Sequence, residues 1–169
     1  MNKRIETTVK EKRKSGRPPE NLKNEMRIEL PAISINEGIA RAVAAVFISQ
    51  LDPTYEELAD LKCAVSEAVT NAIVHAYKNT QGYIYITMKI SGERTIRIEV
   101  RDKGCGIEDV KAAMQPLYTT DPDGERSGMG FTVMENFTDR LYVISHPGRG
   151  TKVTMIKTLS DARNIKGGD

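Results

Sequence analysis

Two neighbouring segments, residues 83–90 and 95–100, alternate between apolar and polar side chains along their whole length. In the first, Ile or Met falls at every second position, with Tyr, Thr and Lys between; in the second, Ile and Val alternate with Arg and Glu. A period of two predicts strands with one buried face, and the short link at residues 91–93 predicts an antiparallel hairpin. One face of the resulting sheet must therefore be covered by other elements.

Helices that could cover this face begin at two predicted capping boxes. Ser34 with Glu37 and Thr54 with Glu57 each place a hydroxyl three residues before a carboxylate, which predicts a helix start. The first helix is expected to run through Leu51, and the second to contain residues 65–77. The residues expected to face inward are Ile39, Val43, Val46 and Phe47 in the first helix, and Leu58, Leu61, Val65, Ala68 and Ala72 in the second.

The remaining segments complete a two-layer pattern. The sequence predicts a short edge strand at 26–31, helices at 107–114 and 130–137, an irregular stretch at 115–127, and strands at 141–146 and 150–159. The predicted fold class is α+β: a two-layer sandwich in which a mixed, largely antiparallel sheet is covered on one face by helices.

Composition limits the chain to one soluble domain. Its 169 residues, 39% hydrophobic and 28% charged, can bury a real core. The longest apolar stretch, residues 39–48, is interrupted by Arg41 and is far shorter than the roughly 20 residues of a membrane helix. With two isolated cysteines and two histidines, no structural metal site is expected. We expect a cytoplasmic protein without a membrane segment.

The basic charge is concentrated near the start of the chain. Residues 1–25 carry eight Lys or Arg against four Glu, a net of +4, and the remaining residues carry 17 against 19, a net of −2. We therefore expect no direct nucleic-acid binding by the folded domain. The expected organisation is a disordered basic tail at 1–24, whose role the sequence leaves open, a domain at 25–160, and a flexible tail at 161–169.

A stripe of polar side chains lies on the second predicted helix. Glu67, Asn71 and His75 are four residues apart, so they stack on one helix face while apolar residues fill the other sides. A solvent-facing stripe more often carries Lys, Glu and Gln. A carboxylate beside a carboxamide on a core helix is either a satisfied polar pair or a functional face.

Three glycine-containing turns follow in order along the chain. Asp102 precedes Gly104 and Gly106, Gly128 and Gly130 open a predicted helix, and Gly150 precedes Thr151; Cys105 lies between two of these glycines. A glycine-rich turn that leads into a helix offers free backbone N–H groups to an anion. Each turn alone also fits an ordinary connection, whereas the order of all three after the polar stripe is far more specific.

In this order the motifs resemble the nucleotide-binding fold shared by gyrase-type, heat-shock-chaperone, histidine-kinase and mismatch-repair ATPases. The resemblance implies ATP and Mg²⁺ as cofactors. It implies that Asn71 holds Mg²⁺ against the phosphates, that Asp102 accepts the adenine amino group, and that Thr151 supports this contact through water. The glycines implied in nucleotide binding are Gly104, Gly106, Gly128 and Gly130.

Two longer segments, residues 24–77 and 115–140, resemble the sporulation anti-sigma factor family, which consists of serine kinases that hold sigma F inactive. This similarity extends from about Asn24 to about Leu159. It implies a homodimer that binds the sigma F subunit of RNA polymerase and phosphorylates an anti-anti-sigma protein on serine. The implied roles are general base for Glu67, γ-phosphate contact for Arg126, and partner contact for Arg41.

Three alternative functions remain open. One is the related anti-sigma kinase of the general stress response, against which the first-helix sequence argues. Another is an ATP-dependent module that sequesters a partner without phosphorylating it; Glu67 argues against this because a pure nucleotide sensor can dispense with a base. A histidine-kinase catalytic fragment is the third, and two capped helices stand where its phosphoacceptor segment is expected. For His75 and Cys105 the sequence indicates a core-edge histidine and a small filler, and it leaves any function open.

Overall fold

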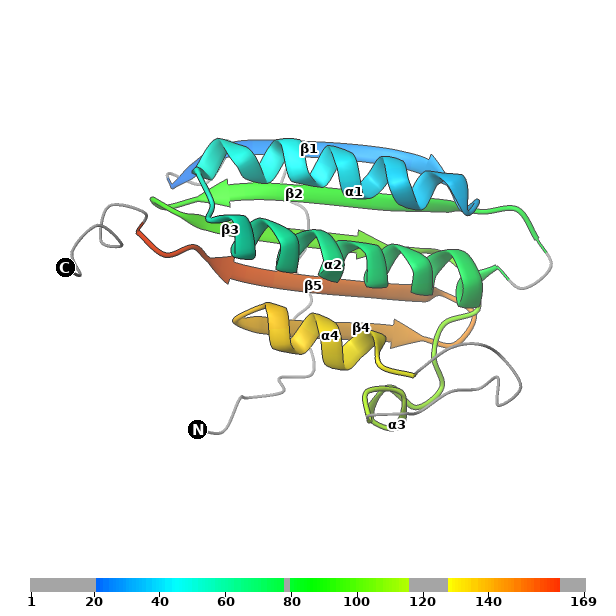
Figure 1. Cartoon of the computed structure of the whole chain (residues 1–169). Coiled ribbons are helices and arrows are strands. Elements are labelled where there is room, and N and C mark those ends of the chain that lie inside the picture. Colours follow the sequence, from blue (N-terminus) through cyan, green and yellow to red (C-terminus); the bar gives the residue numbers. More distant parts are fainter. Residues whose placement is uncertain (1–20, 78–79, 116–127, 162–169) are drawn as a thin grey trace.

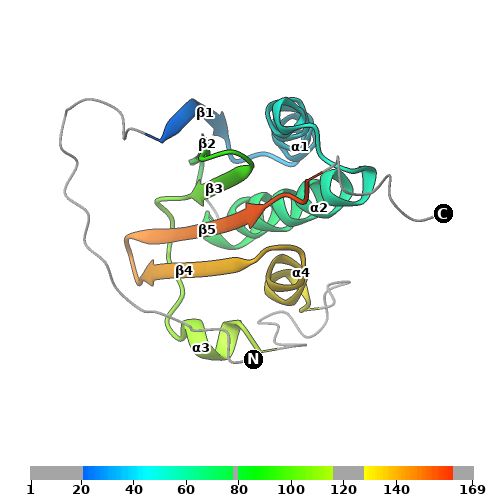
Figure 2. The same cartoon turned by 90° about the vertical axis from the view of Figure 1, so that its left-hand side faces the viewer.

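The structure, a computed structural model, describes residues 21–77, 80–115 and 128–161. Its five strands form one antiparallel sheet in the order β1-β2-β3-β5-β4. The strands are β1 (Leu22–Pro31), β2 (Tyr83–Ser91), β3 (Thr95–Arg101), β4 (Arg140–His146) and β5 (Gly150–Thr158). The α-helices are α1 (Ile35–Ile48), α2 (Tyr55–Asn71), α3 (Val110–Ala113) and α4 (Gly130–Phe137). Helices α1, α2 and α4 cover one face of the sheet (Figure 1), and an orthogonal view shows the two layers edge-on (Figure 2).

The predicted α+β sandwich is confirmed, and all described strand pairs are antiparallel. The β2–β3 hairpin forms in the register that its alternation predicts: Ile86 lies opposite Val100, and Met88 opposite Ile98. All four side chains are buried against the helical layer. Across the described residues, none of the helices is both long and apolar enough to span a bilayer.

The capping box at the start of α2 is confirmed. Thr54 accepts a hydrogen bond from the Glu57 backbone N–H at 3.1 Å, and the Glu57 carboxylate accepts one from the Thr54 N–H at 3.0 Å. The same carboxylate accepts hydrogen bonds from the backbone N–H and the hydroxyl of Ser160, after the end of β5. The helix start is thus attached to the sheet. The predicted core side of α2 is buried or half-buried at all five positions: Leu58, Leu61, Val65, Ala68 and Ala72.

The capping box predicted at Ser34 is wrong. Ser34 has helical backbone angles (φ −57°, ψ −37°), so its side chain makes no capping hydrogen bond. The Glu37 N–H instead donates to the Ser34 backbone carbonyl. The Glu37 carboxylate accepts a hydrogen bond from the Ser66 hydroxyl of α2 and lies 3.4 Å from the Arg41 guanidinium. A side chain on the neighbouring helix therefore competes for the carboxylate that the capping box requires.

The inward face of α1 also differs from the prediction. Phe47 is buried and Val43 half-buried, as predicted, but Ile39 is 46% exposed and Val46 75% exposed. The buried positions of the helix are Asn36, Ala40, Ala44, Phe47 and Ile48. Two alanines let α1 lie close to α2, because a small side chain permits close approach of helices. Ile39 and Val46 are left on the outside, whereas Phe47 and Ile48 are buried.

Element ends differ from the predictions at several places. Helix α1 ends at Ile48 rather than Leu51, and a 3₁₀ turn follows at Ser49–Leu51. Strand β1 begins at Leu22 rather than Met26, and it lies at a sheet edge as predicted, paired along β2 as far as Ser91. Residues 22–24, which we assigned to the tail, therefore belong to the sheet. Helix α3 covers only Val110–Ala113 of the predicted 107–114. The predicted tails fall mainly on residues 1–20 and 162–169, which lie outside the described residues.

Candidate functional site

The polar pair that the sequence singles out lies at the end of α2. Glu67 and Asn71 are half-buried, and the helix side chains around them, including Val65, Ala68 and Val69, are fully buried in the core. After Asn71 the α-helix gives way to a π-helical turn at Ala72–Ala76. His75 lies within this turn and is half-buried, like Glu67 and Asn71. Single π-helical turns of this kind are frequent at functional sites.

The start of α4 lies directly against this pair. A Cβ atom added to Gly130 would stand 2.9 Å from Glu67 Oε2 and 3.2 Å from Asn71 Nδ2. Any larger residue here would push the two polar side chains aside. Gly128 precedes the helix with a positive φ of 63°, a conformation that glycine adopts readily. The structure thus brings Glu67, Asn71, Gly128 and Gly130 together at a helix N-terminus, whose free N–H groups favour an anion. Arg126 lies outside the described residues.

Asp102 is the buried carboxylate of the site. It follows β3 directly and is 5% exposed. Its Oδ1 accepts hydrogen bonds from the backbone N–H of Gly104 at 2.9 Å and of Thr151 at 3.1 Å. Both of these hydrogen bonds go to the same carboxylate oxygen. Burial raises the pKa of Asp102 above its ordinary value, against the lowering effect of these two hydrogen bonds.

Glycines join the Asp102 turn to the rest of the site. A Cβ at Gly104 would stand 2.0 Å from the carbonyl oxygen of Ala76, in the π-helical turn that follows Asn71. A Cβ at Gly106 would stand 2.2 Å from the carbonyl oxygen of His146, and Gly106 also has a positive φ of 73°. These two glycines therefore allow protein backbone to pack against backbone. Backbone of the same chain fills the space where their side chains would stand. The contact of these two glycines with nucleotide stays a prediction.

Ser145 is a site residue that sequence reasoning missed. Its hydroxyl lies 2.8 Å from the Thr151 hydroxyl, and it accepts a hydrogen bond from the Ile107 backbone N–H at 2.7 Å. Ser145 therefore connects Thr151 to the turn that follows Asp102. The sequence could have indicated Ser145 through the predicted hairpin of β4 and β5, because the register of this hairpin places Ser145 directly opposite Thr151.

Tyr77 is a second supporting residue outside the motifs. Its hydroxyl accepts a hydrogen bond from the Lys103 backbone N–H at 2.9 Å and donates to the Tyr83 carbonyl at 2.8 Å. The turn after Asp102 is thereby held to the start of β2. Cys105, in the same turn, is exposed, and its thiol donates to the His75 carbonyl at 3.0 Å. The predicted role of Cys105 as a space filler does not match this exposure.

Arg41 lies away from these residues, on α1. Its side chain is 47% exposed and forms an i,i+4 ion pair with Glu37 at 3.4 Å. Glu37 in turn accepts a hydrogen bond from Ser66, the residue before Glu67 on α2. The structure therefore keeps Arg41 out of the nucleotide constellation, on a separate surface that contacts the same helix.

A family model of the histidine kinase-like ATPase domain matches residues 31–157. The anti-sigma F factor of Anoxybacillus flavithermus is 50% identical over 145 residues, covering 85% of this chain and 99% of that protein. The anti-sigma F factor of Clostridium acetobutylicum is 54% identical over 139 residues, covering 82% of this chain and 96% of that protein. The chain belongs to the anti-sigma F factor family. It is an anti-sigma factor with a nucleotide-binding domain of the kinase-like ATPase type.

Solved structures share the fold of this anti-sigma F factor family member. The RsbU and RsbW domains of Rv1364c from Mycobacterium tuberculosis match with a TM-score of 0.60 at 22% identity, over 82% of this chain and 33% of that one. The blue-light activated histidine kinase of Erythrobacter litoralis EL346 matches with a TM-score of 0.53 at 23% identity, over 73% of this chain and 42% of that one. At these identities the likeness concerns the fold alone.

Proposed function

We propose that this protein binds and inhibits sigma F, and that it uses Mg-ATP to phosphorylate an anti-anti-sigma antagonist on serine. The observation that carries the kinase activity is the contact of Glu67 and Asn71 with the start of α4, marked by the 2.9 Å and 3.2 Å approaches of a Cβ at Gly130. A carboxylate that can accept a proton and a carboxamide that can bind a cation meet there at a helix N-terminus suited to phosphate.

Asp102 is proposed to hold the adenine ring. Two backbone N–H groups fix its Oδ1, and the remaining oxygen is suited to accept a hydrogen bond from the exocyclic amino group. Burial strengthens such a contact, because water competes poorly for a carboxylate that is 5% exposed. Thr151, held by Ser145, supports the same contact from β5.

Asn71 is proposed to hold Mg²⁺. This ion is usually bound through one or two protein oxygens together with substrate phosphates, which fits a single carboxamide oxygen beside Gly130. When bound, Mg²⁺ supplies charge neutralisation at the phosphates. Glu67 takes the proton of the substrate serine while the serine oxygen forms its bond to the γ-phosphorus and the bond to the ADP oxygen breaks. Arg126 is assigned to the γ-phosphate charge.

The partner surface is proposed to lie on α1. Ile35, Ile39 and Val46 are spaced four and seven residues apart and are 75%, 46% and 75% exposed, so they form an uncovered apolar stripe. Arg41 stands on the same helix with half of its side chain exposed. An apolar stripe accompanied by an arginine is typical of a protein interface. We propose that sigma F and the antagonist use this surface, and that the protein is a cytoplasmic homodimer.

Two observations favour this function over the alternatives. A sequestering module without kinase activity has no need for a carboxylate at the phosphate end, yet Glu67 contacts the start of α4. An anti-sigma kinase of the general stress response shares the chemistry, but the curated relatives at 50% to 54% identity are named anti-sigma F factors.

The decisive experiment combines two measurements on the purified protein. Incubation with γ-labelled ATP, Mg²⁺ and the candidate anti-anti-sigma protein should transfer label to a serine of that protein. A separate titration with sigma F should give a stable complex. Sigma binding without transfer of label would support the sequestering module instead, and the absence of both would overturn the proposal.

A further inference from the structure

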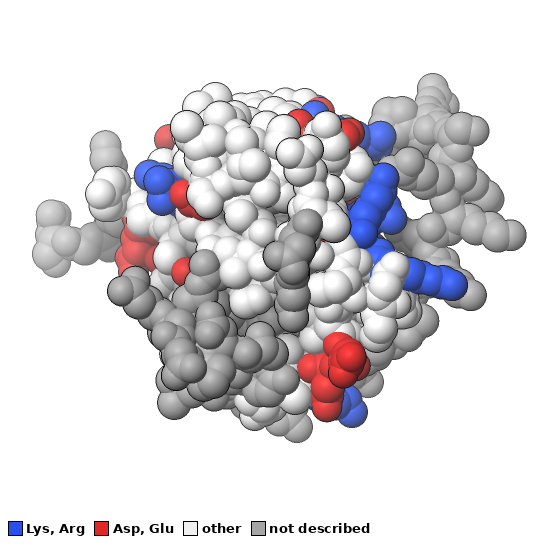
Figure 3. Space-filling model, turned by 90° about the vertical axis from the view of Figure 1, so that its right-hand side faces the viewer, with Lys and Arg blue, Asp and Glu red and all other residues white. Residues whose placement is uncertain are grey.

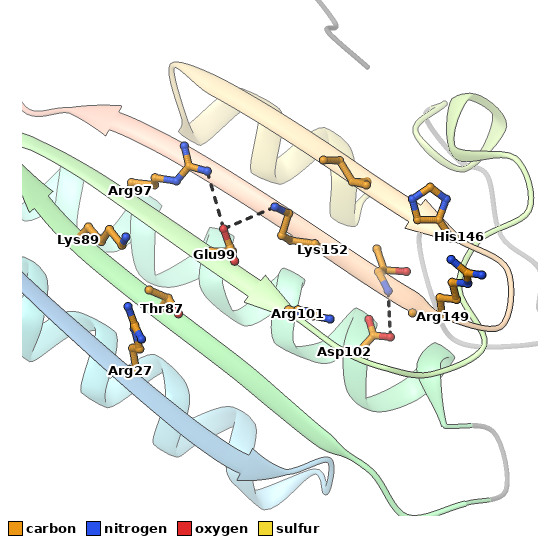
Figure 4. Close-up of a pocket in the computed structure, with 13 residues that line it drawn as sticks. Arg27, Thr87, Lys89, Arg97, Glu99, Arg101, Asp102, His146, Arg149 and Lys152 are labelled. Atoms are coloured by element: carbon orange, nitrogen blue, oxygen red, sulfur yellow. Dashed lines mark hydrogen bonds and ion pairs between the residues drawn. The ribbon is translucent and has the colours of Figure 1, made fainter. Parts of the chain in front are cut away.

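The face of the sheet opposite the helices carries a concentration of positive charge. A cavity of about 770 Å³ lies over this open face. Six of its thirteen lining residues are Lys or Arg: Arg27, Lys89, Arg97, Arg101, Arg149 and Lys152, which together we call the basic sheet face. Figure 4 shows them in front of β1, β2, β3 and β5, with the helices behind. The end-on view shows Lys and Arg side chains gathered on this side of the molecule (Figure 3).

This concentration contrasts with the rest of the domain. Only Glu99 and Asp102 supply negative charge to the cavity lining, so its six basic residues leave a net of +4. Residues 26–169 as a whole have a net of −2. The basic sheet face is therefore a local feature of one surface, unrelated to the charge of the N-terminal segment.

Strand register places like charges directly beside one another on this face. Lys89 lies opposite Arg97 across β2 and β3, and Arg101 lies opposite Lys152 across β3 and β5. Like charges directly opposite in a sheet are destabilising. Two carboxylates partly compensate these charges: Glu99 lies 3.7 Å from Arg97 and 3.9 Å from Lys152, and Glu25 of β1 lies 2.6 Å from Arg27 and 3.7 Å from Lys89. Each carboxylate is thus shared between two basic side chains. The fold alone does not require this arrangement, whereas an acidic ligand would be stabilised by it.

We propose that the basic sheet face docks an acidic, extended segment of a partner protein. Same-face side chains along a strand stand about 6.6–6.8 Å apart, and neighbouring strands about 4.8 Å apart. Alternate side chains of an extended peptide repeat at the same spacing along the chain. Carboxylates on one side of such a peptide can therefore pair with successive Lys and Arg side chains of the basic sheet face. Glu99, at the centre, can accept a hydrogen bond from a backbone N–H of the docked segment.

The lining favours a protein over the other polyanions. It contains no Phe, Tyr or Trp, so it offers no stacking platform for the bases of a single-stranded nucleic acid. The Glu99 carboxylate can accept a hydrogen bond from a peptide N–H, a donor that a phosphodiester backbone lacks. A second copy of the same face is also disfavoured, because pairing would bring two positive surfaces together. This inference goes beyond the proposed function and does not depend on nucleotide.

A matched pair of variants tests the proposal in the full chain. Lys89→Gln/Arg97→Gln removes two charges from the face at a distance from the nucleotide residues. Lys62→Gln/Lys111→Gln removes two charges from α2 and α3, away from the face. Binding of a fluorescent oligoglutamate peptide, without nucleotide and at low salt, should weaken about fivefold or more in the first variant and stay near the parent value in the second. Neither variant should have a lower thermal midpoint than the parent, which shows that both are folded.

Four outcomes would overturn the proposal. The first is an unchanged peptide affinity in the face variant. The second is an equal loss in both variants, which would mean nonspecific attraction. A short duplex or single-stranded oligonucleotide that binds more tightly than the peptide and depends on the same two residues would assign the face to nucleic acid. A change of oligomeric state in the face variant, measured by sedimentation, would assign it to contact between copies.

Discussion

The Glu67 side chain lies between helices α2 and α4, which leave it little room to move. The core residues of α2 fix its position in the helix, and Gly130 of α4 approaches within a distance that admits no side chain. A group held in this way loses little conformational entropy when a substrate arrives. Its chemistry can therefore be tested by a change that keeps its size and removes only its ability to accept a proton.

Glu67→Gln should abolish most phosphotransfer while leaving ATP binding and sigma capture intact. Loss of a general base typically lowers a rate by about 10²- to 10⁴-fold. The measurement is transfer of γ-label to the antagonist in single-turnover conditions. Glu56→Gln, at the exposed start of the same helix, is the matched control and should keep the parent rate. Near-parent transfer by the Glu67 variant would mean that another group takes the proton.

Asp102→Asn should weaken ATP binding without weakening the fold. The amide oxygen can still accept from Gly104 and Thr151, but the amide nitrogen then faces the adenine amino group, donor against donor. An unpaired buried donor costs about 1–3 kcal/mol, or roughly 10- to 100-fold in affinity. Calorimetric titration with ATP measures this loss. An unchanged dissociation constant would remove Asp102 from the adenine contact.

The stability of the same variant provides an internal control. Burial raises the pKa of Asp102, so its contribution to stability is present below the unfolded-state pKa and is lost as pH rises through the folded-state pKa. Above the folded-state pKa the ionised carboxylate therefore lowers stability, and the neutral amide removes this effect. Thermal unfolding should show a midpoint equal to or above that of the parent, and a clear decrease would point to a structural role instead.

At the scale of elements, helix α2 carries the site at one end and its stabilising cap at the other. The capping box at Thr54 satisfies backbone N–H groups that the helix cannot satisfy internally. Glu57 extends this contact to Ser160 beyond β5. The orientation of α2 on the sheet is therefore supported far from Glu67.

Thr54→Ala should destabilise the domain by about 1 kcal/mol, the usual effect of losing an N-cap side chain. Ser34→Ala is a matched control at the start of α1, where the serine makes no capping hydrogen bond, and it should change stability little. Urea denaturation of both variants measures the difference. Equal losses would mean that the two helix starts are stabilised alike.

Glu57 should make part of the stability depend on pH. Burial raises the pKa of Glu57, but hydrogen bonds from Ser160 and Thr54 outweigh it and hold this pKa below the ordinary value of 4.5. The stabilisation is therefore present above the unfolded-state pKa and lost as pH falls through the folded-state pKa. The stability gap between parent and Glu57→Gln should be largest near neutral pH and shrink below pH 4.5. A gap independent of pH would contradict this.

At the scale of the whole molecule, the two proposed activities use different surfaces. The residues proposed to bind nucleotide lie at the end of α2, at the start of α4 and in the turns after β3 and before β5. The exposed apolar stripe and Arg41 lie on α1. Helix α2 contacts both surfaces. Its Ser66 donates a hydrogen bond to Glu37 of α1, and its Glu67 lies against the start of α4.

Arg41→Glu should abolish sigma capture and leave ATP binding intact. The reversal replaces a donor-rich guanidinium with an acceptor and places two carboxylates four residues apart, beside Glu37. If Arg41 is central to the interface, the loss is about 2 kcal/mol or more. Separate titrations with sigma F and with ATP measure the two effects, and Lys111→Glu is the control reversal on α3. Full sigma binding by the Arg41 variant would place the partner surface elsewhere.

Much of this architecture follows from local patterns in the chain. The period of two in β2 and β3, the Thr54 cap and the helix at Gly130–Phe137 all depend on residues close in sequence, and the structure confirms them. The order of the polar pair and the glycine turns likewise needs no three-dimensional information to be recognised. By itself the sequence determined the fold class, the family and the residues worth testing.

The tertiary structure decided which face of each helix and strand is buried, and against which other element. Helix periodicity shows that Ile39 and Ala40 point in different directions, but only packing against α2 selects the alanine as the buried one. The same holds for Glu37, which binds Ser66 instead of capping its own helix, and for Gly104, which approaches the Ala76 backbone. Ser145 and the basic sheet face depend on strand register. Local periodicity determines which residues share one surface of a helix or strand. Which element packs against that surface depends on contacts between residues distant in the chain, and local patterns do not contain the energies of those contacts.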